Sequence, residues 1–177
     1  IKGVQLLDLL TGRYDVVTTN PPYMGGWSMG DGLLTSVKEL FPKASNDLYA
    51  CFIQRCTELT RISGITSMIT QQTFMFTSRY FDMRVQLLSS VRIRTLAHLG
   101  AHAFEDISGE KVNTVMFAVQ KSGTPEALGT YIDLTDLPGK ASILRETAAD
   151  PEVGRAPRFL VAQSQFRSVS SWPIAYW

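Results

Sequence analysis

The sequence predicts an α/β fold in which parallel strands are followed by an antiparallel last strand. Short β-branched runs alternate with segments of helical spacing, in the order strand, helix, strand, helix, strand, strand. Helical connections between the early strands favour parallel pairing, and the short final connection favours an antiparallel return. Of the 177 residues 45% are hydrophobic and 19% charged, which indicates a globular domain with a hydrophobic core.

The first predicted strand, Tyr14 to Thr19, ends at Pro21 and Pro22, because proline has no backbone N–H for a sheet ladder. A glycine-rich loop follows, with a short helical stretch near residues 33–40. The next helix begins at Ser45 or Asn46 and extends to about residue 61.

Gly64 is interpreted as the residue that breaks this helix before a strand at residues 65–70. A helix is expected at 79–90, a strand at 93–99, a polar loop at 100–111 and a strand at 112–120. Beyond residue 121 many glycines and prolines interrupt the pattern, and one short strand near 129–134 is expected. The predicted division is therefore an α/β part at 1–122 and an irregular extension at 123–177.

Several features point away from other kinds of function. The net charge of +1 gives no strong overall field toward nucleic acid or anionic lipid, which neither excludes nor supports DNA binding, because local patches can suffice. No apolar run is long enough to span a membrane. The two cysteines are interpreted as small buried hydrophobes in a reducing bacterial cytoplasm. His98 and His102 lack metal-ligand geometry. A basic stretch is interpreted as a solvated face, and it comprises Arg79, Arg84, Arg92 and Arg94.

The Asn20-Pro21-Pro22-Tyr23 turn carries the clearest chemistry. It follows a strand whose carboxyl end is where open α/β sheets bind ligands. Asn20 Oδ1 and the Pro21 carbonyl can accept both hydrogens of an exocyclic amine, which directs the nitrogen lone pair toward an electrophilic methyl group. Tyr23 can stack on the base. The alternative is a plain Asn-Pro turn that closes a strand.

The segment Asp15–Tyr23 resembles motif IV of the amino-methyltransferases. Residues 46–53 and 63–69 resemble the large adenine-specific DNA methyltransferases of fused restriction–modification enzymes, a broad group that includes phage-exclusion (BREX) methyltransferases. The resemblance covers about residues 14–121, with a weaker echo at 159–177. It implies a partial Rossmann-like class I methyltransferase sheet.

The resemblance also implies the site and its ligands. Asn20, Pro21, Pro22 and Tyr23 would be the catalytic residues, with Asn20 also touching the cofactor S-adenosyl-L-methionine. Phe104 matches the family's second aromatic, so Tyr23 and Phe104 would hold a flipped adenine of double-stranded DNA between them.

A glycine-rich cofactor turn and an acidic ribose-binding residue are expected before the motif, and neither occurs in the first 13 residues. We therefore expect a fragment that lacks the N-terminal cofactor half, stops before a target-recognition domain and binds cofactor weakly alone. The strand at 14–19 is then expected to be an open sheet edge that promotes self-association.

Two other functions stay open on the sequence alone. The same motif serves a protein-glutamine or RNA amino-methyltransferase, because any planar amide or amino group fits the two acceptors. The chain can also be a non-catalytic remnant that acts as an interaction module.

Overall fold

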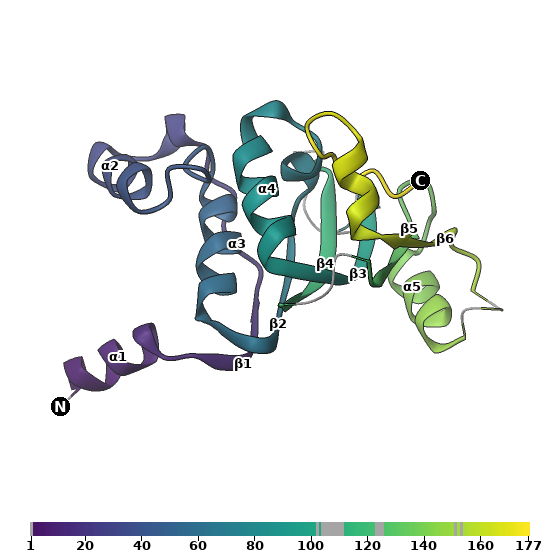
Figure 1. The fold of residues 1–177 in the computed structure, drawn as a ribbon, viewed down its shortest axis with the longest axis horizontal. Coiled ribbons are helices and arrows are strands. Elements are labelled where there is room, and N and C mark those ends of the chain that lie inside the picture. The colour runs from purple at the N-terminus through teal and green to yellow at the C-terminus, as the bar shows by residue number, and fades with distance from the viewer. Residues whose placement is uncertain (1, 102, 104–111, 123–125, 151, 153) are drawn as a thin grey trace.

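The computed structural model describes residues 2–101, 103, 112–122, 126–150, 152 and 154–177. Its centre is a six-stranded sheet in the order β1-β2-β4-β3-β5-β6 (Figure 1). The strands are β1 (Tyr14–Thr19), β2 (Thr60–Gln71), β3 (Val91–Gly100), β4 (Thr114–Lys121), β5 (Leu128–Asp133) and β6 (Arg158–Ala162).

The pairing confirms the predicted mixed sheet. β1 pairs with β2 in parallel, and β3 pairs with β5 in parallel. β4 lies antiparallel between β2 and β3, and is therefore the predicted antiparallel return. β6 is antiparallel to β5 and was not predicted.

The sheet separates two apolar clusters, and helices lie beside it. The helices are α1 (Lys2–Thr11), α2 (Asp31–Leu40), α3 (Leu48–Leu59), α4 (Phe81–Ser90) and α5 (Lys140–Ala149), with short 3-10 turns η1 (Gly26–Ser28), η2 (Gln72–Met75), η3 (Ser78–Tyr80) and η4 (Gln163–Ser168). Figure 1 shows α3, α4 and η4 along one side of the sheet. Neighbouring strand residues such as Leu96 and Ala97 belong to different apolar clusters, as alternation across a strand requires.

The junction between α3 and β2 differs from the prediction. The helix already ends at Leu59, and Thr60 Oγ1 donates to the Cys56 carbonyl at 2.8 Å. Ser63 has a φ of 66°, and the β1–β2 register shifts beside it. A Cβ on Gly64 would lie 2.7 Å from the Asp15 carbonyl oxygen. Gly64 is therefore needed for the close approach of β1 to β2, and its interpretation as a helix breaker was wrong.

Residues beyond 121 contain more regular structure than expected. β5 overlaps the short strand predicted near 129–134, whereas α5 and β6 were missed. Only two residues of α5 are buried, Ile143 and Thr147. Because so few positions of the helix face the core, its sequence lacks the repeat of apolar residues that would predict a helix. α1 was also missed, and none of its residues is buried. The division of the chain at residue 122 stays a prediction.

The basic stretch was interpreted wrongly at one position. Arg84 is fully buried, and its guanidinium donates to the Phe74, Thr77 and Ser171 carbonyls at 2.8, 2.6 and 2.9 Å. Both cysteines are free and buried, as expected. Within the described residues no helix is long and apolar enough to cross a membrane.

Candidate active site

The Asn20–Tyr23 turn leaves the sheet at the carboxyl end of β1, as the sequence predicted. Thr19, the last residue of β1, pairs with Met68 near the carboxyl end of β2. Asn20 and Pro22 are exposed, whereas Pro21 is buried and Tyr23 is half-buried. The turn therefore presents the Asn20 side chain to solvent while its middle is anchored in the protein.

Asp47 fastens the chain beyond the turn to the start of α3. Its Oδ1 accepts hydrogen bonds from the backbone N–H groups of Tyr49 at 3.2 Å and Met24 at 3.0 Å. The first is an ordinary helix N-cap, and the second reaches the residue next to Tyr23. The Leu48 N–H donates to the Met24 carbonyl at 3.0 Å, and the Gly26 N–H donates to the Asn46 carbonyl at 3.0 Å. One carboxylate thus fixes both the helix and the turn.

The Tyr23 ring rests on a layer of buried aromatic side chains. It meets Tyr49 edge to face, with 6.1 Å between ring centroids and 83° between ring planes. Tyr49 in turn contacts Phe74 and Tyr80, and its hydroxyl bonds to Thr73 Oγ1 at 2.8 Å. These neighbours hold the Tyr23 ring in one orientation, which suits a stacking surface.

The Tyr23 hydroxyl is buried and has no hydrogen-bond partner among the described residues. Burial, and then the nearby negative charge of Asp47, raise the pKa of Tyr23 above its ordinary value of 10. The hydroxyl is therefore neutral at physiological pH. Tyr23 can contribute its ring face to a substrate but not a negative charge.

We expect Asp47→Ala to lower the stability of the protein by about 1–2 kcal/mol, the usual cost of a lost N-cap. It should also speed hydrogen exchange at the Met24 N–H, because this group loses the acceptor that fixes the turn. Asp47→Asn keeps the accepting oxygen and should restore most of both. Urea unfolding and amide hydrogen exchange at Met24 measure the two effects. Equal damage by Asp47→Asn would show that charge matters and not the shared acceptor.

The second predicted stacking residue, Phe104, lies outside the described residues, as does His102. The sandwich of Tyr23 and Phe104 therefore stays a prediction. The chain that leads toward Phe104 is fixed at its start, because Lys140 Nζ donates to the carbonyls of Leu99, Ala101 and Thr135. Gly100 has a φ of 62°, a left-handed conformation that favours glycine. A Cβ at this position would also lie only 3.1 Å from Thr135 Cα, so glycine is required there.

His98 lies at the end of β3 in a structural role, as the sequence suggested. It is buried, and its Nδ1 bonds to the Tyr176 hydroxyl at 2.9 Å while its Nε2 bonds to Gln72 Oε1. Burial lowers the pKa of His98, which keeps the ring neutral. No cluster of three potential metal ligands occurs in the part of the chain that the structure describes.

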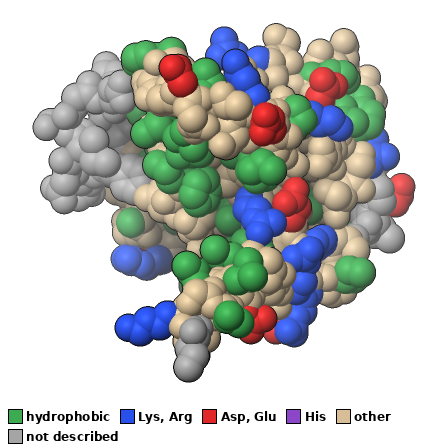
Figure 2. Space-filling view, turned by 90° about the vertical axis from the view of Figure 1, so that its left-hand side faces the viewer, with side chains coloured by type: hydrophobic (Ala, Val, Ile, Leu, Met, Phe, Trp, Pro, Cys, Tyr) green, Lys and Arg blue, Asp and Glu red, His purple; other side chains and the backbone are tan. Residues whose placement is uncertain are grey.

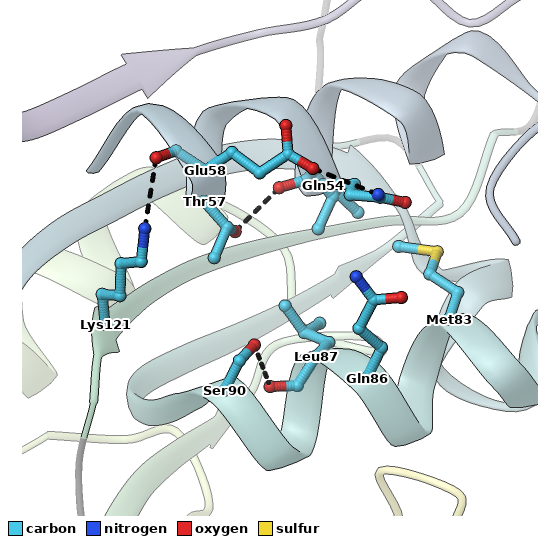
Figure 3. A pocket seen from close by; sticks show the side chains of 9 residues that line it. Gln54, Thr57, Glu58, Met83, Gln86, Leu87, Ser90 and Lys121 are labelled. Atoms are coloured by element: carbon cyan, nitrogen blue, oxygen red, sulfur yellow. Dashed lines mark hydrogen bonds between the residues drawn. The ribbon is translucent and has the colours of Figure 1, made fainter. Parts of the chain in front are cut away.

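A cavity of about 160 Å³ lies between α3 and α4 (Figure 3). Its lining residues come from the two helices and the end of β4, and they are Ile53, Gln54, Thr57, Glu58, Met83, Gln86, Leu87, Ser90 and Lys121. Lys121 Nζ donates to the Glu58 and Thr60 carbonyls at 3.1 and 2.8 Å, which closes the carboxyl end of α3. No residue of the Asn20–Tyr23 turn lines this cavity, so we separate it from the candidate active site.

Sequence reasoning placed the turn correctly but missed the residues behind it. It assigned Asp47 only a helix-terminus charge, and it gave Tyr49 and Thr73 no role. An Asn-Asp pair directly before an apolar helical run is the signal that could have suggested the cap. Its bond to Met24 depends on contacts between residues 23 positions apart, which spacing does not reveal.

Comparison with known proteins identifies the family of the chain. The family model described as "Eco57I restriction-modification methylase" matches residues 4–104. The chain is 37% identical to the adenine-specific methyltransferase PglX of Lacticaseibacillus casei (strain Zhang), over 95% of this chain. It is 34% identical to the adenine-specific methyltransferase BrxX of Escherichia coli O9:H4 (strain HS), over 100% of this chain. The chain spans 14% of the length of each of these relatives.

Solved structures share the fold at low identity. A modification subunit of a putative type I restriction enzyme from Vibrio vulnificus YJ016 aligns with a TM-score of 0.65 and 15% identity, over 87% of this chain and 34% of that one. The type ISP restriction-modification enzyme LlaGI, solved with a DNA substrate mimic, aligns with a TM-score of 0.61 and 13% identity, over 89% of this chain and 18% of that one.

A putative class I S-adenosylmethionine-dependent methyltransferase from Listeria monocytogenes aligns with a TM-score of 0.55 and 13% identity, over 78% of this chain and 43% of that one. The sheet therefore has the class I methyltransferase fold, with the antiparallel strand inserted between two parallel ones. The family model covers more than half of the chain. The chain belongs to the Eco57I restriction-modification methylase family.

Proposed function

We propose that this chain is part of the catalytic domain of a DNA adenine-N6 methyltransferase of a restriction–modification or phage-defence system. One observation carries the proposal: the Asn20–Tyr23 turn stands at the carboxyl end of β1, with Asn20 exposed and the Tyr23 ring held against Tyr49. The names of the relatives, adenine-specific methyltransferases, support adenine as the substrate.

The turn supplies positioning and hydrogen-bond acceptors. Asn20 Oδ1 and the Pro21 carbonyl accept the two hydrogens of the target amine, and the Tyr23 face supports the base plane. This placement would direct the lone pair of the amine nitrogen away from the base plane, toward an electrophilic methyl carbon in line with it. As the new N–C bond forms, the methyl donor would keep the electron pair of the broken bond, and the nitrogen would release one proton to solvent. Catalysis rests on this placement of the two partners and of the charge that develops on the amine, because no side chain has to act as a covalent nucleophile.

S-adenosyl-L-methionine supplies the electrophilic methyl group when bound. The exposed side chain of Asn20 fits one wall of such a site, because its amide can bond to polar atoms of the cofactor while its oxygen faces the amine.

The substrate base is proposed to leave the DNA duplex before it reaches the turn. An amine inside a base pair cannot give both hydrogens to protein acceptors, so the adenine must be extruded. Phe104 is proposed to cover the face of the adenine opposite Tyr23. LlaGI in complex with a DNA substrate mimic has the same fold, which supports double-stranded DNA as the partner.

A methylation assay with the full-length protein tests the proposed function. Duplex DNA, RNA and a release-factor protein are offered separately with labelled cofactor, and the products are analysed for N6-methyladenine and methylglutamine. Methyladenine in DNA is the expected product. Methylation of RNA or of a protein glutamine instead would support the alternative amino-methyltransferases, and no transfer to any substrate would support a non-catalytic interaction module.

We further propose that the isolated chain self-associates through β1. This strand pairs with β2 on one side and forms the edge of the described sheet, and its Val16 side chain is 63% exposed. Exposed hydrophobic side chains of α1 precede the strand: Val4, Leu6, Leu7, Leu9 and Leu10. Figure 2 shows hydrophobic side chains gathered among Lys and Arg on this side of the molecule.

Light scattering of the isolated chain should therefore show dimers or larger species. Val16→Lys places a charge on the edge strand and should shift the population toward monomer. Ile62→Lys is the matched control, because Ile62 is 79% exposed but belongs to β2. A monodisperse wild-type monomer would refute self-association.

A further inference from the structure

Trp27 is an almost fully exposed side chain on the segment that follows the Asn20–Tyr23 turn. It is 94% exposed, the highest value among the large exposed hydrophobic side chains of the described residues. An indole this exposed leaves a large, flat apolar face in water, which a planar ligand can cover. Trp27 lies four residues beyond Tyr23, in the 3-10 turn η1.

The backbone around Trp27 is held on both sides. Gly25 forms an isolated bridge with Asp47, and the Gly26 N–H donates to the Asn46 carbonyl. After the turn, the Met29 N–H donates to the Gly26 carbonyl at 3.3 Å, and the Met29 side chain is buried. The backbone that carries Trp27 is therefore fixed relative to the Asn20–Tyr23 turn by the same contacts that fix the turn.

The indole itself lies across Gly25. A Cβ at Gly25 would stand 2.9 Å from Trp27 Nε1 and 3.2 Å from Cδ1. The Gly25 backbone, with φ −65° and ψ 153°, is open to any residue, so the absence of a side chain serves the ring and not the backbone. Glycine at position 25 gives the ring a place beside the turn.

The surroundings of Trp27 favour a nucleic-acid base over a protein surface. Its immediate neighbours in the chain are Gly25, Gly26 and Ser28, which add no apolar side chains around the ring. Protein-binding hot spots are instead ringed by contacts that exclude water. Lys43 and Arg79 are exposed near Asn46, whose Nδ2 donates to the Arg79 carbonyl at 3.5 Å, and such charges suit DNA phosphates.

We propose that Trp27 stacks on a DNA base next to the adenine that the enzyme extrudes. This role rests on the proposed function, and it adds a DNA-contacting residue outside the Asn20–Tyr23 turn. A flipped adenine leaves its neighbours without a stacking partner, and the planar indole replaces part of the lost stacking. Trp27 therefore contributes to DNA binding and to extrusion, and does not contact the reacting amine.

Steady-state kinetics of the full-length protein test this role, with duplex DNA as the varied substrate. Trp27→Ala should raise the KM for DNA about tenfold, the loss expected for one base–aromatic stack. The KM for S-adenosyl-L-methionine should not change. Trp27→Phe keeps an aromatic face and should restore most of the affinity, whereas Gly25→Ala, which displaces the indole, should raise the KM several-fold. Leu40→Ala is the matched control, because Leu40 is 68% exposed on α2, the helix that follows this turn.

The wild-type result separates the two proposals. A wild-type enzyme that does not methylate adenine in DNA would overturn the proposed function and the role of Trp27 with it. A wild-type enzyme that does, together with a Trp27→Ala variant of unchanged KM for DNA, would overturn only the role of Trp27. An unchanged KM with a lower melting temperature would mean that another part of the protein covers the ring, and it would also overturn the proposal.

Discussion

Replacement of Asn20 with alanine is expected to lower kcat of the full-length enzyme by a factor of about 10²–10³, the cost of removing one preorganised hydrogen-bonding group from a reacting centre. The amine keeps the Pro21 carbonyl as an acceptor but loses the partner for its second hydrogen. The lone pair is then no longer directed at the methyl group. Asn20 is exposed, so its removal should leave the melting temperature nearly unchanged. Single-turnover methylation of duplex DNA measures the effect.

Tyr23→Phe is the matched control for Asn20→Ala. The Tyr23 hydroxyl is buried without a partner among the described residues, and the ring contact with Tyr49 does not need it. Tyr23→Phe should therefore retain kcat within about threefold, because the stacking face is kept. A rate loss for Tyr23→Phe as large as that for Asn20→Ala would show that the hydroxyl takes part in the reaction. An Asn20→Ala enzyme of normal kcat would refute the assigned role of Asn20.

Arg84→Ala is expected to destabilise the protein by about 3–5 kcal/mol. The substitution leaves the buried carbonyl of Phe74 and the part-buried carbonyls of Thr77 and Ser171 without their donor. Each one that water cannot reach costs about 1–3 kcal/mol, and the lost side chain leaves a cavity as well. Two of these carbonyls, Phe74 and Thr77, belong to the chain behind Tyr49, and the third, Ser171, belongs to the C-terminal segment. Urea unfolding of the chain measures the loss.

Arg79→Ala provides the comparison, since Arg79 is exposed five residues before Arg84 and should cost less than about 0.5 kcal/mol. Arg84→Lys retains the charge but cannot reach three carbonyls from one planar group, so its stability should lie between wild type and alanine. Burial lowers the pKa of Arg84, yet arginine remains charged. Equal stability of the Arg84→Ala and Arg79→Ala proteins would contradict this account.

The features that could be predicted from the sequence are those that depend on neighbouring residues. Two prolines must end β1, because they lack the N–H that a sheet needs, and the short connection after β3 must give an antiparallel strand. The sequence therefore predicts that the turn Asn20–Tyr23 lies at the carboxyl end of a strand, as the structure shows.

The features that were missed depend on distant contacts. The residues around Arg84 do not distinguish it from the exposed Arg79. The free-energy cost of burying its charge is offset by hydrogen bonds to the carbonyls of residues 74, 77 and 171, which the sequence does not show to be close. α5 buries two residues, too few for a helical pattern, and β6 is recognisable only beside β5. Asp47 looked like a simple cap, because its bond to Met24 crosses the glycine-rich segment.

The attachment of the turn to α3 has a consequence for how this region tolerates change in length. The Gly26 N–H and the Asn46 carbonyl are hydrogen-bonded at 3.0 Å, so the intervening chain, α2 included, begins and ends at one point. Insertions in a surface excursion with joined ends cost little closure entropy. Length changes at the exposed start of this excursion, residues 30–33, should therefore leave the geometry of the turn intact. Val37 and Ala44 are buried and anchor the rest of it in the core, so changes there should cost stability.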